Sequence, residues 1–108
     1  MLTLNKDCEK KNLGGGVTRK VLSYDTNMMV CELTFTKGAV GTLHSHPHQQ
    51  IGYVVSGSFE VEDAGKKMIL KAGDSYLIKS NSIHGVVALE DSKLLDVFTP
   101  MREDFIKK

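Results

Sequence analysis

Short runs of apolar residues, separated by glycines and polar residues, follow one another along almost the whole chain. Valine, isoleucine, leucine, tyrosine and phenylalanine dominate these runs, and most of these residue types favour β-strands. Turn signals recur every eight to twelve residues, a spacing typical of an all-β sandwich or barrel. The runs that we predict as strands are 17–24, 28–36, 39–46, 51–57, 58–63, 66–73, 75–80, 84–91 and 93–100.

The segments between and beyond these runs are short. The Ala-Gly pair at 64–65 predicts a hairpin turn, and the Lys-Ala-Gly-Asp segment at 71–74 predicts a second one. The tail at 102–108 is compatible with one helical turn. Residues 1–12 are mostly polar, and we expect a loosely ordered lead-in or a segment that crosses to a partner subunit. We interpret residues 1–108 as a single domain, because a chain of this length encloses one core.

Composition and charge narrow the class of protein. Of the 108 residues, 41% are hydrophobic and 25% are charged, the balance of an ordinary globular domain. A net charge of +1 gives no indication of a strongly basic surface, which argues against nucleic acid as the main partner. We find no apolar run that could cross a membrane and no apolar secretion signal, so we expect a cytoplasmic protein without membrane contacts. Cys8 and Cys31 are then expected to be free thiols, with Cys31 in the core.

The four histidines fall in two places, and three of them lie within five positions. His44 and His46 are two residues apart in an expected strand, so their imidazoles share a face. A proline interrupts the chain, which then resumes as a strand that can return Gln50 to the same interior, and His84 arrives from a later strand. Ligands from three strands suit one divalent transition metal ion such as Zn, Ni, Fe, Mn or Co. We expect His48, next to the proline, to point elsewhere, toward the barrel rim.

A second unusual feature is Asp96, which sits within the run 93–100 among residues that look buried on both faces. An unpaired buried carboxylate is costly, so such a group is usually paired, liganded or functional. If the face shared by Asp96 and Phe98 lines the interior, both look toward the metal, and Arg102 can clamp a carboxylate at the pocket mouth. Alternatively, Asp96 lies on an exposed edge strand, and Arg102 pairs at the surface with one of the two acidic residues that follow it.

The histidine region resembles the first motif of the cupin superfamily, G-x5-H-x-H-x3,4-E-x6-G. Every spacing fits, with Gln50 in place of glutamate, on the residues Gly38, His44, His46, Gln50 and Gly57. The second motif, G-x5-P-x-G-x2-H-x3-N, keeps its spacing, its first glycine and the ligand His84, but not its other residues. The resemblance covers about residues 17–102 and implies a single-domain cupin jelly-roll β-barrel, often a homodimer.

Within the cupins, the chain resembles the KdgF family of pectin-degradation proteins. The matching segments are GGGVTRK (14–20), KGAVGTLHSHPHQQIGYVVSG (37–57), GDSYLI followed by N-x-x-HGV (73–86) and LDVFTPMREDF (95–105). The resemblance implies catalytic roles for Asp96, Phe98 and Arg102, and a metal on His44, His46, Gln50 and His84. It also implies an isomerase-type reaction on a small anionic sugar: ring opening and ketonisation of 4,5-unsaturated monouronates from pectin or alginate to linear 5-keto-4-deoxyuronates.

Two other functions stay open at this point. One is a non-catalytic module that binds a sugar acid, although such a module does not need the proton-transfer group that Asp96 provides. The other is a metal-dependent dioxygenase of the quercetinase type. Neutral Gln50 in place of glutamate leaves the metal site more positive, which disfavours loss of an electron from the metal and favours polarising a carbonyl or enolate. Arg19 is a weaker candidate for substrate contact, because arginines on strands are commonly exposed.

Overall fold

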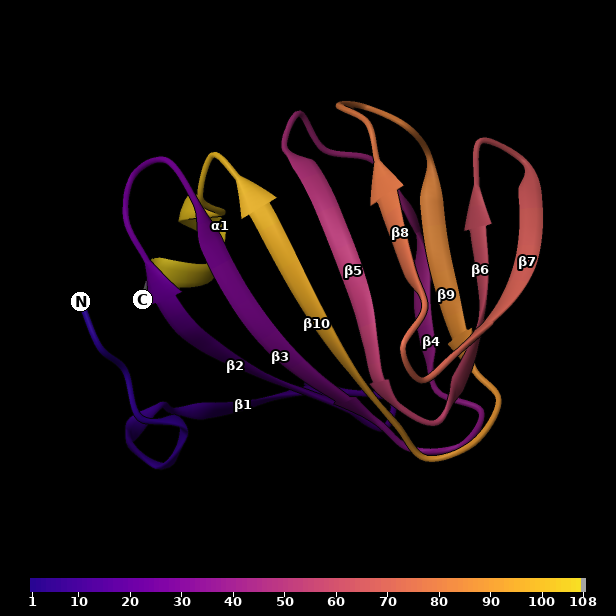
Figure 1. Ribbon diagram of the computed structural model, residues 1–108, viewed down its shortest axis with the longest axis horizontal. Coiled ribbons are helices and arrows are strands. Elements are labelled where there is room, and N and C mark those ends of the chain that lie inside the picture. The colour runs from indigo at the N-terminus through magenta and orange to yellow at the C-terminus, as the bar shows by residue number, and fades with distance from the viewer. Residues whose placement is uncertain (108) are drawn as a thin grey trace.

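The chain folds into two antiparallel sheets that pack face to face, as a computed structural model describing residues 1–107 shows (Figure 1). The strands are β1 (Lys10–Gly14), β2 (Val17–Tyr24), β3 (Met29–Phe35), β4 (Val40–His44), β5 (Gln49–Ser56), β6 (Ser58–Asp63), β7 (Lys66–Lys71), β8 (Ser75–Ile78), β9 (His84–Ala88) and β10 (Ser92–Thr99). A 3-10 turn, η1 (Asn5–Asp7), precedes β1, and one helical turn, α1 (Glu103–Ile106), follows β10.

The sheets have different sizes and no common edge. The six-stranded sheet has the order β1-β2-β3-β10-β5-β8, and the four-stranded sheet has the order β4-β9-β6-β7. No ladder within residues 1–107 joins them, so the predicted barrel is not closed, whereas the jelly-roll cupin architecture is confirmed. Two twisted sheets bury their inner faces by packing on one another without closing a ring. The chain changes sheet between β5 and β6 at Gly57, whose φ of 78° favours glycine.

Every predicted run contains a strand, with small differences at the ends. The run 39–46 shortens to Val40–His44, because the chain leaves the ladder before the proline at position 47. Strand β1 was not predicted, since its residues KKNLG show no apolar alternation and are all exposed. It forms by pairing with β2, which places Lys11 opposite Arg19. The loose order predicted for residues 1–12 stays a prediction.

The core lies between the sheets and follows the two-residue alternation of the strands. Val54 and Phe59 are completely buried, and the Phe59 ring meets Phe35 edge-on at a centroid distance of 5.1 Å. Burying side chains of this size stabilises the fold by roughly 1.5–3 kcal/mol each. Cys31 is also buried, next to Met29, and it is a free thiol, as predicted.

Strand β10 is an interior strand, hydrogen-bonded to β3 on one side and to β5 on the other. Its inward residues, Asp96 among them, are buried, whereas Leu95 and Val97 are half-buried on the outer face of the sheet. The expectation of burial on both faces is therefore wrong for the outer face. The alternative that put Asp96 on an exposed edge strand is also wrong, because ladders flank β10 on both sides.

Both predicted turns and the helical turn are confirmed. Ala64 and Gly65 have φ values of 50° and 82°, the left-handed conformation that a tight hairpin requires. In the second turn, the Asp74 backbone N–H donates to the Lys71 carbonyl over 2.9 Å, and the Lys71 backbone N–H donates to the Asp74 carboxylate over 2.8 Å. Among residues 1–107, no helix combines the length and the apolar character needed to span a membrane.

Candidate metal centre

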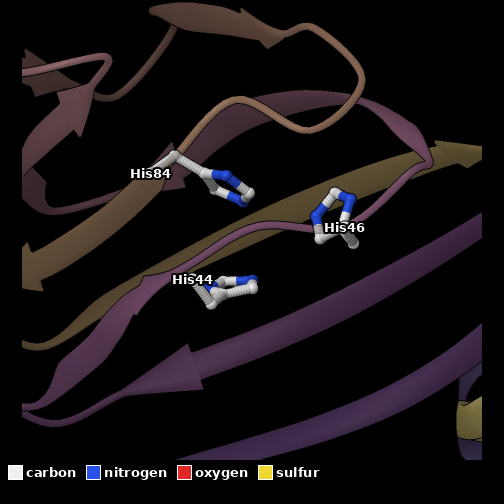
Figure 2. A group of neighbouring side chains, drawn as sticks. All are labelled: His44, His46 and His84. Atoms are coloured by element: carbon white, nitrogen blue, oxygen red, sulfur yellow. The ribbon is translucent and has the colours of Figure 1, made fainter.

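Three histidine side chains converge on one point, as Figure 2 shows. His44 ends β4 and His84 begins β9, and the two residues are direct partners across the ladder. His46 lies two residues beyond β4, in the loop that leads to β5. One ring nitrogen from each histidine lies within 4.8 Å of the others. One strand pairing and one short loop therefore bring together the three imidazoles that the sequence predicted as metal ligands.

The orientation of each ring is set through its Nδ1 atom. Each Nδ1 lies 2.8–2.9 Å from a backbone carbonyl oxygen two residues away along the chain. A carbonyl can only accept, so each Nδ1 carries the proton, and each Nε2 keeps a lone pair. Hydrogen bonds of this kind fix the tautomer and the direction of metal-binding imidazoles. The three Nε2 atoms are consequently the ones with a lone pair that can bind a metal ion.

The chemistry of this donor set fits a divalent transition metal. The Nε2 of His84 is buried and has no hydrogen-bond partner within residues 1–107, a costly state for a polar atom unless a ligand occupies it. Burial lowers the pKa of His84, and burial together with the charge of Arg102 lowers the pKa of His46. Both rings therefore stay neutral, the form that binds metal.

Gln50 faces the histidines from β5 and is 5% exposed. Its Oε1 lies 3.0 Å from the Nε2 of His46. Because the proton of His46 is on Nδ1, this contact joins two acceptors, which is stable only when a proton or a cation lies between them. The Gln50 side chain also lies near the carboxylate of Asp96 and lowers its pKa. The amide oxygen of Gln50 therefore faces the histidines.

Asp96 points inward from β10 and is 6% exposed. The hydroxyl of Tyr76 donates to its Oδ1 over 3.2 Å. Burial raises the pKa of Asp96 to about 6, although hydrogen bonds from Gln50 and Tyr76 and the charge of Arg102 oppose the rise. The structure therefore places this carboxylate beside the candidate metal ligands, with a hydrogen bond from Tyr76.

The strand pattern did not identify Tyr76 as a residue of the site, although Gly52 could have indicated it. Gly52 is the β5 partner of both Tyr76 on β8 and Asp96 on β10. A Cβ atom at position 52 would overlap the Tyr76 ring. A glycine in the middle of an apolar strand thus leaves the space through which the Tyr76 side chain reaches Asp96.

Phe98 and Arg102 complete this side of the site. Phe98 is 3% exposed, and its ring centroid lies 5.7 Å from that of His46. The guanidinium carbon of Arg102 lies 5.2 Å from the Phe98 ring centroid. The same guanidinium donates to both carboxylate oxygens of Asp104, over 3.1 Å and 3.0 Å. Arg102 therefore lines the cavity and also pairs with a neighbouring acid, and its contact with a substrate carboxylate stays a prediction.

A cavity of about 220 Å³ lies beside the histidine cluster and is lined from both sheets. Among its lining residues are His44, Gln50, His84, Asp96, Phe98 and Arg102. Arg19 lines it as well and is 8% exposed, so the expectation of an exposed arginine is wrong. The alternation of β2 turns Arg19 inward together with Val17. His48 borders a separate depression next to Met101, but its ring centroid lies 5.5 Å from that of His46, so its predicted direction toward the rim stays a prediction.

The fold and the three-histidine cluster define the class of protein. Residues 31–98 match the family model for the cupin domain, which is more than half of the chain, and the chain therefore belongs to the cupin family. Within that family it groups with KdgF. It is 48% identical over 98 residues to the pectin degradation protein KdgF of Dickeya dadantii (strain 3937), with 89% of each chain covered.

Solved structures agree with this grouping. The structure of KdgF from Halomonas sp. superimposes with a TM-score of 0.93 at 40% identity, covering 97% of both chains. An RmlC-like cupin from Shewanella frigidimarina NCIMB 400 also gives a TM-score of 0.93, at 38% identity, over 96% of this chain and 94% of that one. A predicted oxalate decarboxylase from Thermotoga maritima, at 19% identity and a TM-score of 0.83, shares the fold alone.

Proposed function

We propose that the protein is a metal-dependent, isomerase-type enzyme of pectin degradation that opens and ketonises 4,5-unsaturated monouronates. The relationship to KdgF at 48% identity supports the pathway. One observation supports the chemistry: a buried carboxylate, Asp96, shares a cavity with two of the clustered histidines and with Gln50. The reaction needs proton transfers and stabilisation of a developing negative charge, with no redox change.

The proposed reaction conserves every atom of the substrate. The C1 hydroxyl loses a proton, the C1–O5 bond breaks, and its electron pair goes to O5, which takes up a proton. This leaves an aldehyde at C1 and an enol across C4 and C5. A proton then adds at C4 while the enol oxygen loses one, and the product is the linear 5-keto-4-deoxyuronate. An enzyme that catalyses these steps therefore needs a group that accepts and returns protons, beside a site that attracts negative charge.

His44, His46, His84 and Gln50 are the residues that would hold the metal, since their free donor atoms face one another. When bound, a divalent ion supplies positive charge that stabilises the negative charge developing on the enolate oxygen. Gln50 adds no charge of its own, so this positive charge is not reduced as it would be by glutamate. We expect Gln50→Glu to tighten metal binding and to lower turnover. Tighter metal binding with unchanged turnover would contradict the charge argument.

Asp96 would move the proton. Tyr76 holds its carboxylate in place at the cavity, and a positioned carboxylate can take a proton from one substrate atom and return it to another. Phe98 would provide an apolar surface against the sugar ring. Arg102 would hold the C6 carboxylate or orient Asp96.

An ultraviolet assay tests this proposal. Metal-loaded protein is added to freshly made 4,5-unsaturated galacturonate, and the absorbance of the C4=C5–carboxylate chromophore is followed against the spontaneous reaction. Asp96→Asn keeps the size of the side chain and removes its basicity, and Asp7→Asn makes the same change on an exposed residue outside the cavity. We expect loss of absorbance well above background with wild type and Asp7→Asn, and loss near background with Asp96→Asn.

Other outcomes point to the alternative functions. Tight uronate binding without turnover would favour a sugar-acid-binding module over an enzyme. Oxygen consumption with a flavonol would favour a dioxygenase, and no consumption would end that alternative. An Asp96→Asn variant as active as wild type would contradict the assigned proton transfer.

We also propose that the protein forms a homodimer. The outer face of the six-stranded sheet exposes the apolar residues Ile51, Tyr53 and Val55 of β5, and Leu77 of β8 lies directly opposite Ile51. A contiguous apolar patch of this kind supports a protein interface. Sedimentation equilibrium tests the assembly, and Tyr53→Glu is expected to shift it to the monomer.

A further inference from the structure

We propose that Arg19 binds the carboxylate of the substrate and thereby selects anionic over neutral sugars. The proposal rests on the proposed function for the identity of the sugar acid. Arg19 belongs to β2, in the six-stranded sheet, whereas His44 and His84 belong to the facing four-stranded sheet. All three residues line the same cavity. A ligand in this cavity can therefore reach the candidate metal centre and Arg19 from two sides.

The side chain of Arg19 is largely buried, with 8% of the residue exposed, and within residues 1–107 its guanidinium has no hydrogen-bond or ion-pair partner. It makes a cation–π contact with the ring of Phe105, whose centroid lies 3.6 Å from the guanidinium carbon. A guanidinium carries five N–H donors, and a ligand that displaces water from the cavity must supply acceptors in its place. Stacked on the ring, the Arg19 guanidinium keeps the edge that bears these donors free for a ligand in the cavity.

Arg102 differs from Arg19 in this respect, and with the one carboxylate of the sugar on Arg19, Arg102 keeps the other of its two proposed roles, which is to orient Asp96. Its fork already donates to both oxygens of Asp104, and its guanidinium carbon lies 4.4 Å from the centroid of the same Phe105 ring. Two guanidinium groups therefore share one ring, and one exposed carboxylate pairs with one of them. The remaining acid of the cavity, Asp96, accepts a hydrogen bond from Tyr76. Arg19 is thus the cavity cation that lacks an acid of its own.

A carboxylate is the group that best fits this vacant position. The planar guanidinium edge matches the two oxygens of a carboxylate, and such charge-assisted pairs are stronger than neutral hydrogen bonds. A neutral sugar would displace water from the N–H groups of Arg19 without giving them a charged partner, so it would bind less well. The competing explanation is structural, in which Arg19 only packs against Phe105 to support α1.

Binding of two unreactive sugars separates these explanations. Galacturonate and galactose share the same ring, differ in carboxylate against hydroxymethyl, and lack the C4=C5 double bond, so calorimetry reports binding without turnover. The variants are Arg19→Met and Arg19→Lys in metal-loaded protein. The matched control is Lys20→Gln, which removes the same charge from the next residue of β2. The Lys20 ammonium donates to the Asn5 side chain over 2.8 Å, so it lies outside the cavity.

We expect wild type and Lys20→Gln to bind galacturonate more tightly than galactose. Arg19→Met should weaken galacturonate binding by about 10- to 100-fold, the usual effect of losing a hydrogen-bonded charge pair, and galactose binding by less than about threefold. Arg19→Lys keeps the charge and loses the fork, and it should fall between wild type and Arg19→Met. Thermal unfolding of each variant confirms that the binding data come from folded protein.

Three results would overturn the proposal: equal weakening of both sugars by Arg19→Met, unchanged galacturonate binding in that variant, or no galacturonate binding by wild type. Turnover distinguishes this failure from a failure of the proposed function. If wild type binds galacturonate through Arg19 but does not ketonise the unsaturated uronate, the proposed function is wrong and the role of Arg19 stands. If it does ketonise the uronate, Arg19→Met should raise KM by a similar factor and change kcat by less than about threefold.

Discussion

Gly52 offers a sensitive test of how the fold supports the site. A Cβ atom at position 52 would overlap the Cζ, Cε2 and Oη atoms of Tyr76. Gly52→Ala must therefore displace the tyrosine ring, and the Tyr76 hydroxyl then loses its 3.2 Å hydrogen bond to Asp96. Gly52 has no side chain that could act in the proposed reaction. Adding one methyl group there is nevertheless expected to lower the stability of the protein and to disturb the orientation of the Asp96 carboxylate.

The expected destabilisation combines three contributions. Forcing a methyl group into a packed site costs about 1–3 kcal/mol. Losing a hydrogen bond to a charged group costs about 1.5–3 kcal/mol. Against these, alanine in place of glycine gains about 0.5–1 kcal/mol by restricting the unfolded chain. We therefore expect the free energy of unfolding to fall by roughly 3 kcal/mol, which lowers the urea midpoint by about 2 M for a typical slope.

The assay is urea unfolding of metal-free protein at pH 7, followed by circular dichroism. A double-mutant cycle with Tyr76→Leu assigns the cause, because leucine lacks the three atoms that the new Cβ would overlap. In the Tyr76→Leu background, Gly52→Ala should cost less than about 1 kcal/mol. The reasoning is refuted if Gly52→Ala changes the free energy of unfolding by less than about 0.5 kcal/mol in wild type, or costs the same in both backgrounds.

Three further outcomes follow from the structure. Adding zinc or nickel to metal-free protein should raise the melting temperature, and His84→Ala should remove most of this rise, because a ligand that binds the folded state stabilises it. Urea unfolding should show that Gly57→Ala destabilises the protein by about 2–4 kcal/mol, since a Cβ there lies 2.7 Å from the Asp91 carbonyl oxygen at a φ of 78°. Gly65→Ala meets open space and should cost only about 1 kcal/mol in the same assay. In a thiol-reagent titration at pH 8, Cys8 should react at once and Cys31 only on unfolding, because burial raises the pKa of Cys31 to about 12 and keeps it protonated.

Much of the architecture could be predicted from local pattern. Apolar alternation located nine of the ten strands. The turn at Ala64-Gly65 was recognisable because a tight hairpin needs residues with positive φ, and glycine adopts that conformation readily. The spacing of His44 and His46 placed their rings on one face without knowledge of the partner strand. Strand β1 escaped prediction because polar residues form it by pairing at a sheet edge, and its own sequence does not require that pairing.

The candidate site depends more strongly on tertiary structure. Asp96 could be on an interior or an edge strand, and only its place between β3 and β5 decided this. Tyr76 reaches Asp96 because Gly52 lies between them in register, and Arg19 reaches the cavity because the two sheets face each other. The sequence by itself thus determined which residues form strands and which pairs share a face, since both follow from backbone geometry over a few residues. Only the tertiary structure decided which faces meet, because strand order, register and sheet packing depend on the burial of apolar surface by the whole chain.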